Sequence, residues 1–172
     1  MSDRAASGFA RALAALNEAS VSYVVVGVTG INFYARTPAE AYATLDLDTL
    51  LEPHIENLKK ALRALTDLGY EIESASEPFL DTSDESTLQT VIRNGATLSA
   101  VHGSDGQVDL LLSISGSSWA EFASDATTFA VAGTEVRVGS LERLLRSKEA
   151  SGRPKDRAFL QLFAARSVDD ED

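Results

Sequence analysis

Residues 44–48 read Thr-Leu-Asp-Leu-Asp, and residues 45–51 together are predicted to form one short extended segment. Alternation of apolar and acidic residues at positions 45–48 predicts a β-strand, in which successive side chains point to opposite faces. Asp46 and Asp48 are then expected on one face, with Leu45 and Leu47 pointing into the other layer. Two carboxylates on one face repel each other unless a cation compensates. Oxygen ligands suit a hard divalent ion, so the pair suggests a site for Mg²⁺ or Mn²⁺.

A third acid, Asp109, lies between Val108 and Leu110 in a second apolar segment. The turn signal at 103–106 predicts a hairpin whose strands are 96–101 and 107–112. An Asp inside an apolar strand is costly to bury without a partner. If the two acidic strands are neighbours, the three carboxylates converge and can hold two metal ions. The alternative is a solvated edge strand for the first two acids and a strand-end position for Asp109, and the pair alone favours that alternative.

The remaining periodicity predicts an alternation of helices and strands, which indicates an α/β fold with a mixed sheet and helices packed mainly on one face. Helices are expected at 4–19, 30–36, 53–68, 117–124, 141–150 and 155–165, with a helical turn at 88–93. Further strands are expected at 21–26, 70–73, 129–131 and 135–138, and an irregular acidic loop at 77–86. Residues 1–166 are expected to form one domain, followed by a disordered acidic tail at 167–172.

Composition limits the class of protein. The chain has 172 residues, 44% of them hydrophobic, and no cysteine, which suits one globular domain and excludes thiolate metal sites. No signal peptide or membrane span is visible, so a soluble cytoplasmic protein without a membrane partner is expected. The net charge of −11 disfavours broad nucleic-acid binding. Seven of the 15 Lys and Arg residues nevertheless fall between Arg137 and Arg157, either as a patch facing the acids or as a solvated helix face.

The order of these motifs resembles the nucleotidyltransferase superfamily: a glycine turn after a strand, Asp-hydrophobic-Asp, then a third acid on a later strand. It most resembles small bacterial nucleotidyltransferase-like proteins related to abortive-infection (AbiEii-type) toxins, over roughly residues 23–162. The segments that carry the resemblance are Val26-Gly27-Val28-Thr29-Gly30, Thr44 to Asp48, Asp109, Ser147-Lys148 and Gly152-Arg153-Pro154-Lys155-Asp156.

The resemblance implies a nucleotidyltransferase-like fold and a reaction in which an acceptor hydroxyl attacks the α-phosphate of an NTP and pyrophosphate leaves. Asp46 and Asp48 would bind Mg²⁺ or Mn²⁺ shared with the triphosphate, and Asp109 would complete the metal site and help to deprotonate the hydroxyl. Gly27 and Val28 would form the nucleotide-binding turn. Lys148, Arg153 and Lys155 are candidates for contacting the phosphates; the alternative for these three is surface solubility. The acceptor is open between RNA, protein and a small molecule.

Two positions depart from the family pattern. Val28 stands where relatives carry a second Gly or a Ser, and a β-branched residue suits a phosphate-binding turn poorly. Tyr34-Ala35 stands where relatives often carry His-Gly. These departures favour a second hypothesis, a non-catalytic relative that binds a nucleotide or a protein partner, for example as one half of a toxin–antitoxin pair. His54, His102 and Trp119 are expected to lie outside the site.

Overall fold

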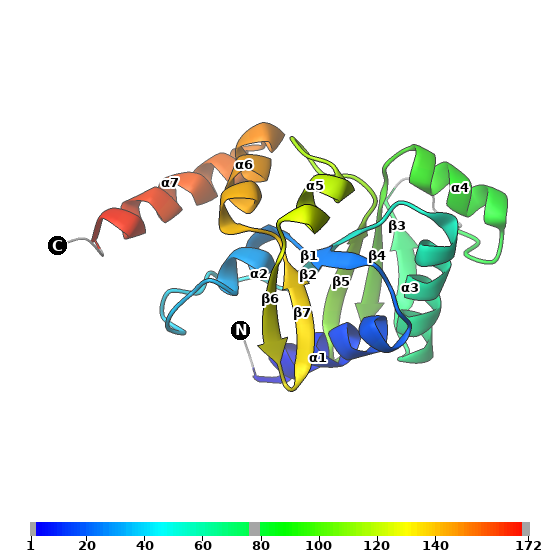
Figure 1. Cartoon of the computed structure of the whole chain (residues 1–172). Helices are drawn as coiled ribbons and strands as arrows, with labels where there is room; N and C mark the ends of the chain where they lie inside the picture. The colour runs from blue at the N-terminus through cyan, green and yellow to red at the C-terminus, as the bar shows by residue number, and fades with distance from the viewer. Residues whose placement is uncertain (1–2, 76–79, 170–172) are drawn as a thin grey trace.

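A single mixed sheet organises the molecule. The computed structural model describes residues 3–75 and 80–169, in which seven strands form one sheet and helices pack around it (Figure 1). This arrangement confirms the expected α/β class. Within the described part of the chain, no helix is both long enough and apolar enough to cross a bilayer.

The sheet brings together strands that are far apart in the sequence. Its order is β3-β4-β5-β2-β1-β7-β6. Strand β2 runs parallel to β5 and β1 runs parallel to β7, while the other neighbouring pairs are antiparallel. The strands are β1 (Tyr23–Val25), β2 (Asp46–Leu51), β3 (Glu71–Ser74), β4 (Thr97–His102), β5 (Gly106–Leu111), β6 (Thr127–Val131) and β7 (Thr134–Val138).

Helices α1 (Asp3–Glu18) and α3 (Ile55–Asp67) cover the sheet and close the core. They pack against each other, and α1 also contacts β5 and β7. Leu16 of the first and Leu58 of the second are fully buried in one hydrophobic cluster with Leu47 of β2. The helices are α1 (Asp3–Glu18), α2 (Gly27–Asn32), α3 (Ile55–Asp67), α4 (Glu85–Arg93), α5 (Trp119–Ser124), α6 (Leu141–Ser151) and α7 (Pro154–Asp169).

The junction between α6 and α7 follows from local signals in the sequence. Ser140 caps α6, since its side chain accepts a hydrogen bond from the backbone N–H of Arg143. Gly152 ends α6 in the left-handed conformation (φ 60°), which glycine adopts without a steric cost. Pro154 then begins α7, and the two helices stay in contact. From there α7 extends away from the body of the molecule (Figure 1).

Three expectations need correction. Helix α2 begins at Gly27 and not at residue 30, because the Gly30 N–H already donates to the Val26 carbonyl. Leu45 does not point into a layer; the residue precedes β2 and is 85% exposed. Helix α7 continues through Asp169, past residue 165, where the last helix was expected to end.

Other expectations are confirmed or extended. Both hairpins, β4–β5 and β6–β7, form as antiparallel pairs. The helical turn expected at 88–93 is the longer helix α4, which begins at Glu85 because Asp84 caps it by accepting from the Thr87 N–H. The end of the expected 77–86 loop is therefore helical. Residues 76–79 and 170–172, which include the rest of the expected acidic tail, lie outside the described residues.

Candidate active site

The three predicted acids lie on two adjacent strands at the centre of the sheet. Asp48 of β2 is the register partner of Asp109 of β5, and Asp46 precedes Asp48 by two residues on the same face. On the opposite face Leu47 and Val108 are fully buried. The acids themselves are only partly buried. The pleat therefore turns the apolar residues to the core and the carboxylates to solvent.

Asp109 is held by two neutral donors that the sequence did not single out. Its Oδ1 accepts from Ser99 Oγ at 2.7 Å and from Gln107 Nε2 at 2.8 Å. Ser99 is its register partner on β4, and Gln107 precedes it by two residues on β5. The two bonds fix the carboxylate and, among the described residues, leave Oδ2 without a hydrogen-bond partner. Only the pairing of β4 with β5 could reveal Ser99.

Gly27 is required beside Asp48 for two reasons. Its φ is +65°, in the left-handed region that glycine tolerates best. A Cβ at this position would also lie 2.0 Å from Asp48 Oδ2. The first turn of α2 therefore fits closely against the acidic strand, and Thr29 ties it there by donating to the Asp46 carbonyl at 2.6 Å.

A cleft of about 520 Å³ opens over these acids and is lined by residues from β1–α2, β2, β4–β5, α6 and α7. Every predicted site residue lines it, including Val28. The lining residues used below are Gly27, Val28, Asp46, Asp48, Asp109, Lys148, Ser151, Arg153, Lys155, Asp156 and Phe159. The structure thus gathers residues spread over more than a hundred positions of the sequence into one place.

Asp156 also lines this cleft, although no role was predicted for it from the sequence. Its side chain is 2% exposed and accepts from Lys148 Nζ at 2.9 Å, Ser151 Oγ at 2.5 Å and Arg153 Nε at 2.7 Å. Lys148 is itself nearly buried, and its Nζ lies 4.8 Å from the centroid of the Phe159 ring. Lys148 is therefore an internal cation fixed by a carboxylate and not a free surface lysine.

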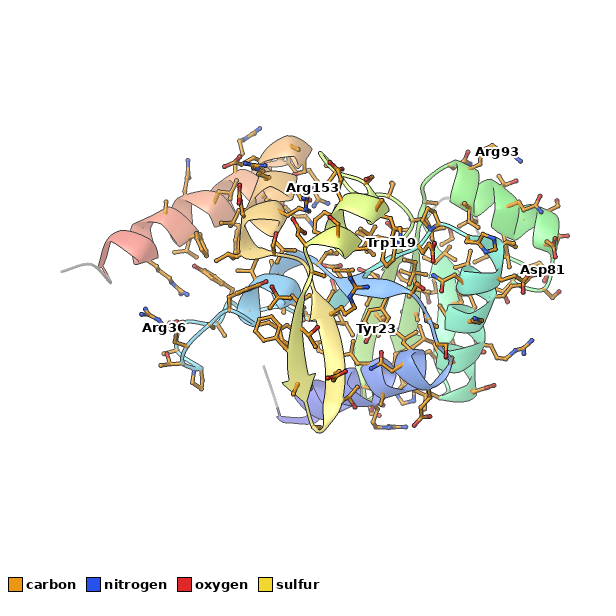
Figure 2. All side chains as sticks on the ribbon, in the orientation of Figure 1. Tyr23, Arg36, Asp81, Arg93, Trp119 and Arg153 are labelled. Carbon is orange, nitrogen blue, oxygen red and sulfur yellow. The ribbon has the colours of Figure 1, made fainter. Side chains whose placement is uncertain are left out.

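The other two cations of the cleft are more open. The Arg153 side chain is 59% exposed and lies at the junction of α6 and α7 (Figure 2). Lys155 is exposed, and within residues 3–75 and 80–169 it makes no hydrogen bond or ion pair. The other four basic residues of this region are engaged elsewhere. Arg143 pairs with Asp125 and Arg146 with Glu142, while Arg137 and Arg157 donate to the carbonyls of Ala123 and Gly152. Of the predicted basic cluster, three members reach the cleft.

The carboxylates experience each other's charge. Burial and then the nearby charges of Asp109 and Asp46 raise the pKa of Asp48 from 3.8 to about 6, against the opposing effect of Lys148 and Lys155. Burial and the charge of Asp109 also raise the pKa of Asp46, which Lys155 partly offsets. Burial is the larger cause of both shifts, and repulsion between the acids, which a bound cation would relieve, adds to it.

Asp156 shows the opposite behaviour. Burial by itself raises its pKa, but hydrogen bonds from Ser151, Lys148 and Arg153 outweigh that effect and lower the pKa to about 2. Asp156 therefore stays ionised at every physiological pH. Its charge is used to hold the two cations and is not available to a ligand.

The donor set of the acidic face suits Mg²⁺ or Mn²⁺, since the three acids supply only oxygen ligands. No group of three His, Cys, Asp or Glu side chains among the described residues stands ready to hold a metal ion by itself. Magnesium is commonly held by one or two carboxylates together with substrate phosphates, and not by an all-protein cage. The arrangement therefore suits a metal that arrives with a phosphate ligand.

The histidines and the tryptophan lie outside the cleft, as expected. His54 caps α3, and His102 accepts hydrogen bonds from the backbone of Ser104 and Asp105 within the β4–β5 turn. Trp119 is partly buried and packs against the core, and Phe122 of the same helix is fully buried.

Comparison with known proteins leaves the chain's function to be inferred from these residues. No protein-family model matches the chain, and no curated protein matches its sequence.

Proposed function

We propose that this protein is a metal-dependent nucleotidyltransferase, which moves an NMP group from an NTP to an acceptor hydroxyl. The observation that carries the proposal is the pairing of Asp48 with Asp109 on adjacent parallel strands, with Asp46 beside them, in a cleft that cations line from α6 and α7. Phosphoryl transfer relies on positioning and charge stabilisation, and carboxylates that hold a metal beside cationic side chains can supply both.

The proposed roles follow from the position of each side chain. Asp46 and Asp48 would hold Mg²⁺ or Mn²⁺, which when bound lowers the negative charge that the α-phosphate develops. Asp109 would take the proton of the acceptor hydroxyl on Oδ2, because Oδ1 is already engaged by Ser99 and Gln107. The acceptor oxygen forms its bond to the α-phosphorus as the bond to the bridging oxygen breaks, and pyrophosphate carries away that electron pair.

Charge in the cleft explains why a metal would be needed for nucleotide binding. Four aspartates, namely Asp46, Asp48, Asp109 and Asp156, face three cations, namely Lys148, Arg153 and Lys155. With all of them ionised the cleft carries one net negative charge, so it repels a free triphosphate. Divalent ions reverse that balance. Nucleotide affinity is accordingly expected to require Mg²⁺ or Mn²⁺.

Val28 favours a second candidate function, in which the cleft binds a nucleotide or a protein partner without catalysis, as in one half of a toxin–antitoxin pair. Val28 is the second residue of α2 and lines the cleft. Its branched side chain adds apolar bulk near the acids where a glycine or a serine would leave the backbone more accessible. Binding of an NTP without transfer would support this candidate.

The deciding experiment is transfer of label from each NTP, with Mg²⁺ or Mn²⁺ and a lysate as the source of acceptors. The proposal expects a labelled product that Asp46→Asn abolishes. Asp125→Asn is the matched control, because it removes an exposed carboxylate paired with Arg143 outside the cleft. Product formation that survives Asp46→Asn, or no product with any NTP, would contradict the enzyme and leave binding as the function to test.

A further inference from the structure

A buried ion-pair cluster lies against the cleft opposite the acidic strand. Asp156 Oδ1 accepts from Lys148 Nζ at 2.9 Å, and the two side chains are 2% and 11% exposed. The other carboxylate oxygen, Oδ2, accepts from Ser151 Oγ and from Arg153 Nε. Both oxygens of the carboxylate are therefore used, and each fixes part of the cleft wall.

Lys148 lies between this cluster and the acids. The ring of Phe159 packs on one side of its ammonium group. Toward the sheet, Lys148 lines the same cleft as Asp48 of β2. Asp156 of α7 and Arg153 of the α6–α7 junction are the charged members of its ion-pair cluster. A nucleotide phosphate held beside Asp48 would meet an ammonium group that is already in place.

We propose that Asp156 is a positioning residue for nucleotide binding, which acts by fixing Lys148 against the acidic strand. The inference rests on the proposed nucleotide function. Pre-ordering matters here because a lysine side chain has several rotatable bonds, and ordering it only when the ligand binds would reduce affinity. Arg153 reaches the same carboxylate from the exposed side and is held less firmly.

Charge and position make opposite predictions for Asp156→Asn. Removal of a negative charge from the cleft should by itself tighten the binding of an anionic triphosphate. Loss of a positioning residue should weaken it, because the Lys148 ammonium group loses the charged partner that holds it. The direction of the change therefore separates a positioning role from a general electrostatic one.

The experiment is titration of Mn²⁺·ATP and Mn²⁺·GTP into wild type, Asp156→Asn, Lys148→Met and the double variant, with thermal unfolding of each measured in parallel. Asp156→Asn is expected to weaken binding about tenfold, the value of one charge-assisted hydrogen bond. In the Lys148→Met background the same change should weaken binding by about threefold or less, because the residue acts through Lys148. Asp125→Asn should leave affinity unchanged.

Each remaining outcome counts against the inference. Unchanged or tighter binding by folded Asp156→Asn overturns the positioning role and leaves the proposed function intact. An equal loss in the Lys148→Met background shows that Asp156 does not act through Lys148. If Asp156→Asn does not fold, Ser151→Ala decides: it keeps the charge but removes one of the two hydrogen bonds to Oδ2. A loss of about two- to threefold in affinity is expected, whereas unchanged affinity overturns the inference. If wild type binds neither nucleotide, the proposed function fails first and this inference fails with it.

Discussion

At the scale of single residues, the raised pKa of Asp48 makes stability depend on pH. The folded chain holds this proton more tightly than the unfolded chain, since the pKa rises from 3.8 to about 6. The contribution of Asp48 to the free energy of unfolding is therefore largest below about pH 4 and is lost as pH rises through about 6. In chelator, we expect Asp48→Asn to remove this decline and to raise the Tm at pH 7 by about 2–4 °C for each kcal/mol of repulsion relieved.

The control for that measurement is Glu71→Gln, a change at an exposed carboxylate on the edge strand β3. The Tm of this variant should depend on pH in the same way as the Tm of wild type. A lower Tm for Asp48→Asn in chelator at pH 7 would show that the acids do not repel one another in the folded state.

Asp156 should produce the reverse dependence on pH. Its pKa is lowered to about 2 in the folded chain, so its stabilising contribution is present above the unfolded value of 3.8 and is lost as pH falls toward 2. Asp156→Ala leaves Lys148 without its buried partner, and we expect a loss of about 3–5 kcal/mol in the free energy of unfolding at pH 7. Urea titration at pH 7 and pH 3 measures both effects; an equal difference from wild type at the two pH values would contradict the ion pair.

Val28 tests which of the two candidate functions holds. Val28→Ser restores a hydroxyl at the start of α2, beside the acids of the cleft. One charge-assisted hydrogen bond contributes about 1.5–3 kcal/mol, so NTP affinity with Mg²⁺ is expected to rise about tenfold or more. Calorimetric titration of both proteins measures the difference. Tight binding by wild type would mean that Val28 is tolerated.

The acids of the cleft could be predicted from the sequence, whereas the groups that hold them could not. Asp46 and Asp48 share a face because of strand periodicity alone, and that regularity is visible in five residues. Ser99 depends on which residue of β4 lies opposite Asp109. Asp156 depends on how the α6–α7 turn brings it back to Lys148. Both are consequences of tertiary pairing, which no local pattern encodes.

At the scale of elements, the junction of β1 and α2 depends on a missing side chain. Gly27→Ala must adopt a positive φ and must also place a methyl group against the Asp48 carboxylate. We expect this variant to lose more than about 2 kcal/mol in total in the free energy of unfolding. The left-handed backbone alone accounts for roughly 1–2 kcal/mol of that loss. Chemical denaturation in chelator measures the loss.

Two other glycines separate the contributions. Gly133 has φ 80° but open space around it, so Gly133→Ala should lose only the backbone part. Gly103 has open space and no positive φ, so Gly103→Ala should be close to neutral. If Gly27→Ala and Gly133→Ala lose the same amount, the contact with Asp48 is unimportant.

Element boundaries show why the strand and helix types were predictable and their ends were not. The periodicity of α3 and the cap at Ser140 act within a few residues, so these helices follow from local sequence. The Asp84 cap is equally local but was missed, so α4 was expected to begin three residues late. The start of α2 was misplaced because Gly27 is both a turn residue and a helical residue. The position of this helix start is set by its packing against β2, where Gly27 lies beside Asp48 and Thr29 donates to the Asp46 carbonyl. The residues of β2 lie outside the local sequence of α2.

At the scale of the whole molecule, metal and nucleotide should stabilise the fold together. A ligand that binds only the folded chain adds about 2.7 kcal/mol at 100 times its Kd, or roughly 5–10 °C in Tm for a domain of this size. We expect Mn²⁺ to raise the Tm of wild type more than that of Asp48→Asn, and NTP to add a further increase only when Mn²⁺ is present. Thermal scans with each component alone and together measure this. A higher Tm with NTP in chelator would contradict the expectation that the net negative charge of the cleft repels a metal-free triphosphate.

The central pairing of β2 with β5 joins segments separated by about sixty residues, and α6 and α7 complete the cleft later still. During synthesis the chain emerges from its N-terminus at about 5–20 residues per second. Asp46 and Asp48 therefore leave the ribosome several seconds before Asp109, and Lys148 and Asp156 follow last. A nascent or truncated polypeptide would carry the first two acids without the strand and helices that make them a site. Whatever chemistry the finished cleft performs, it cannot begin until translation has passed the codon for Asp156.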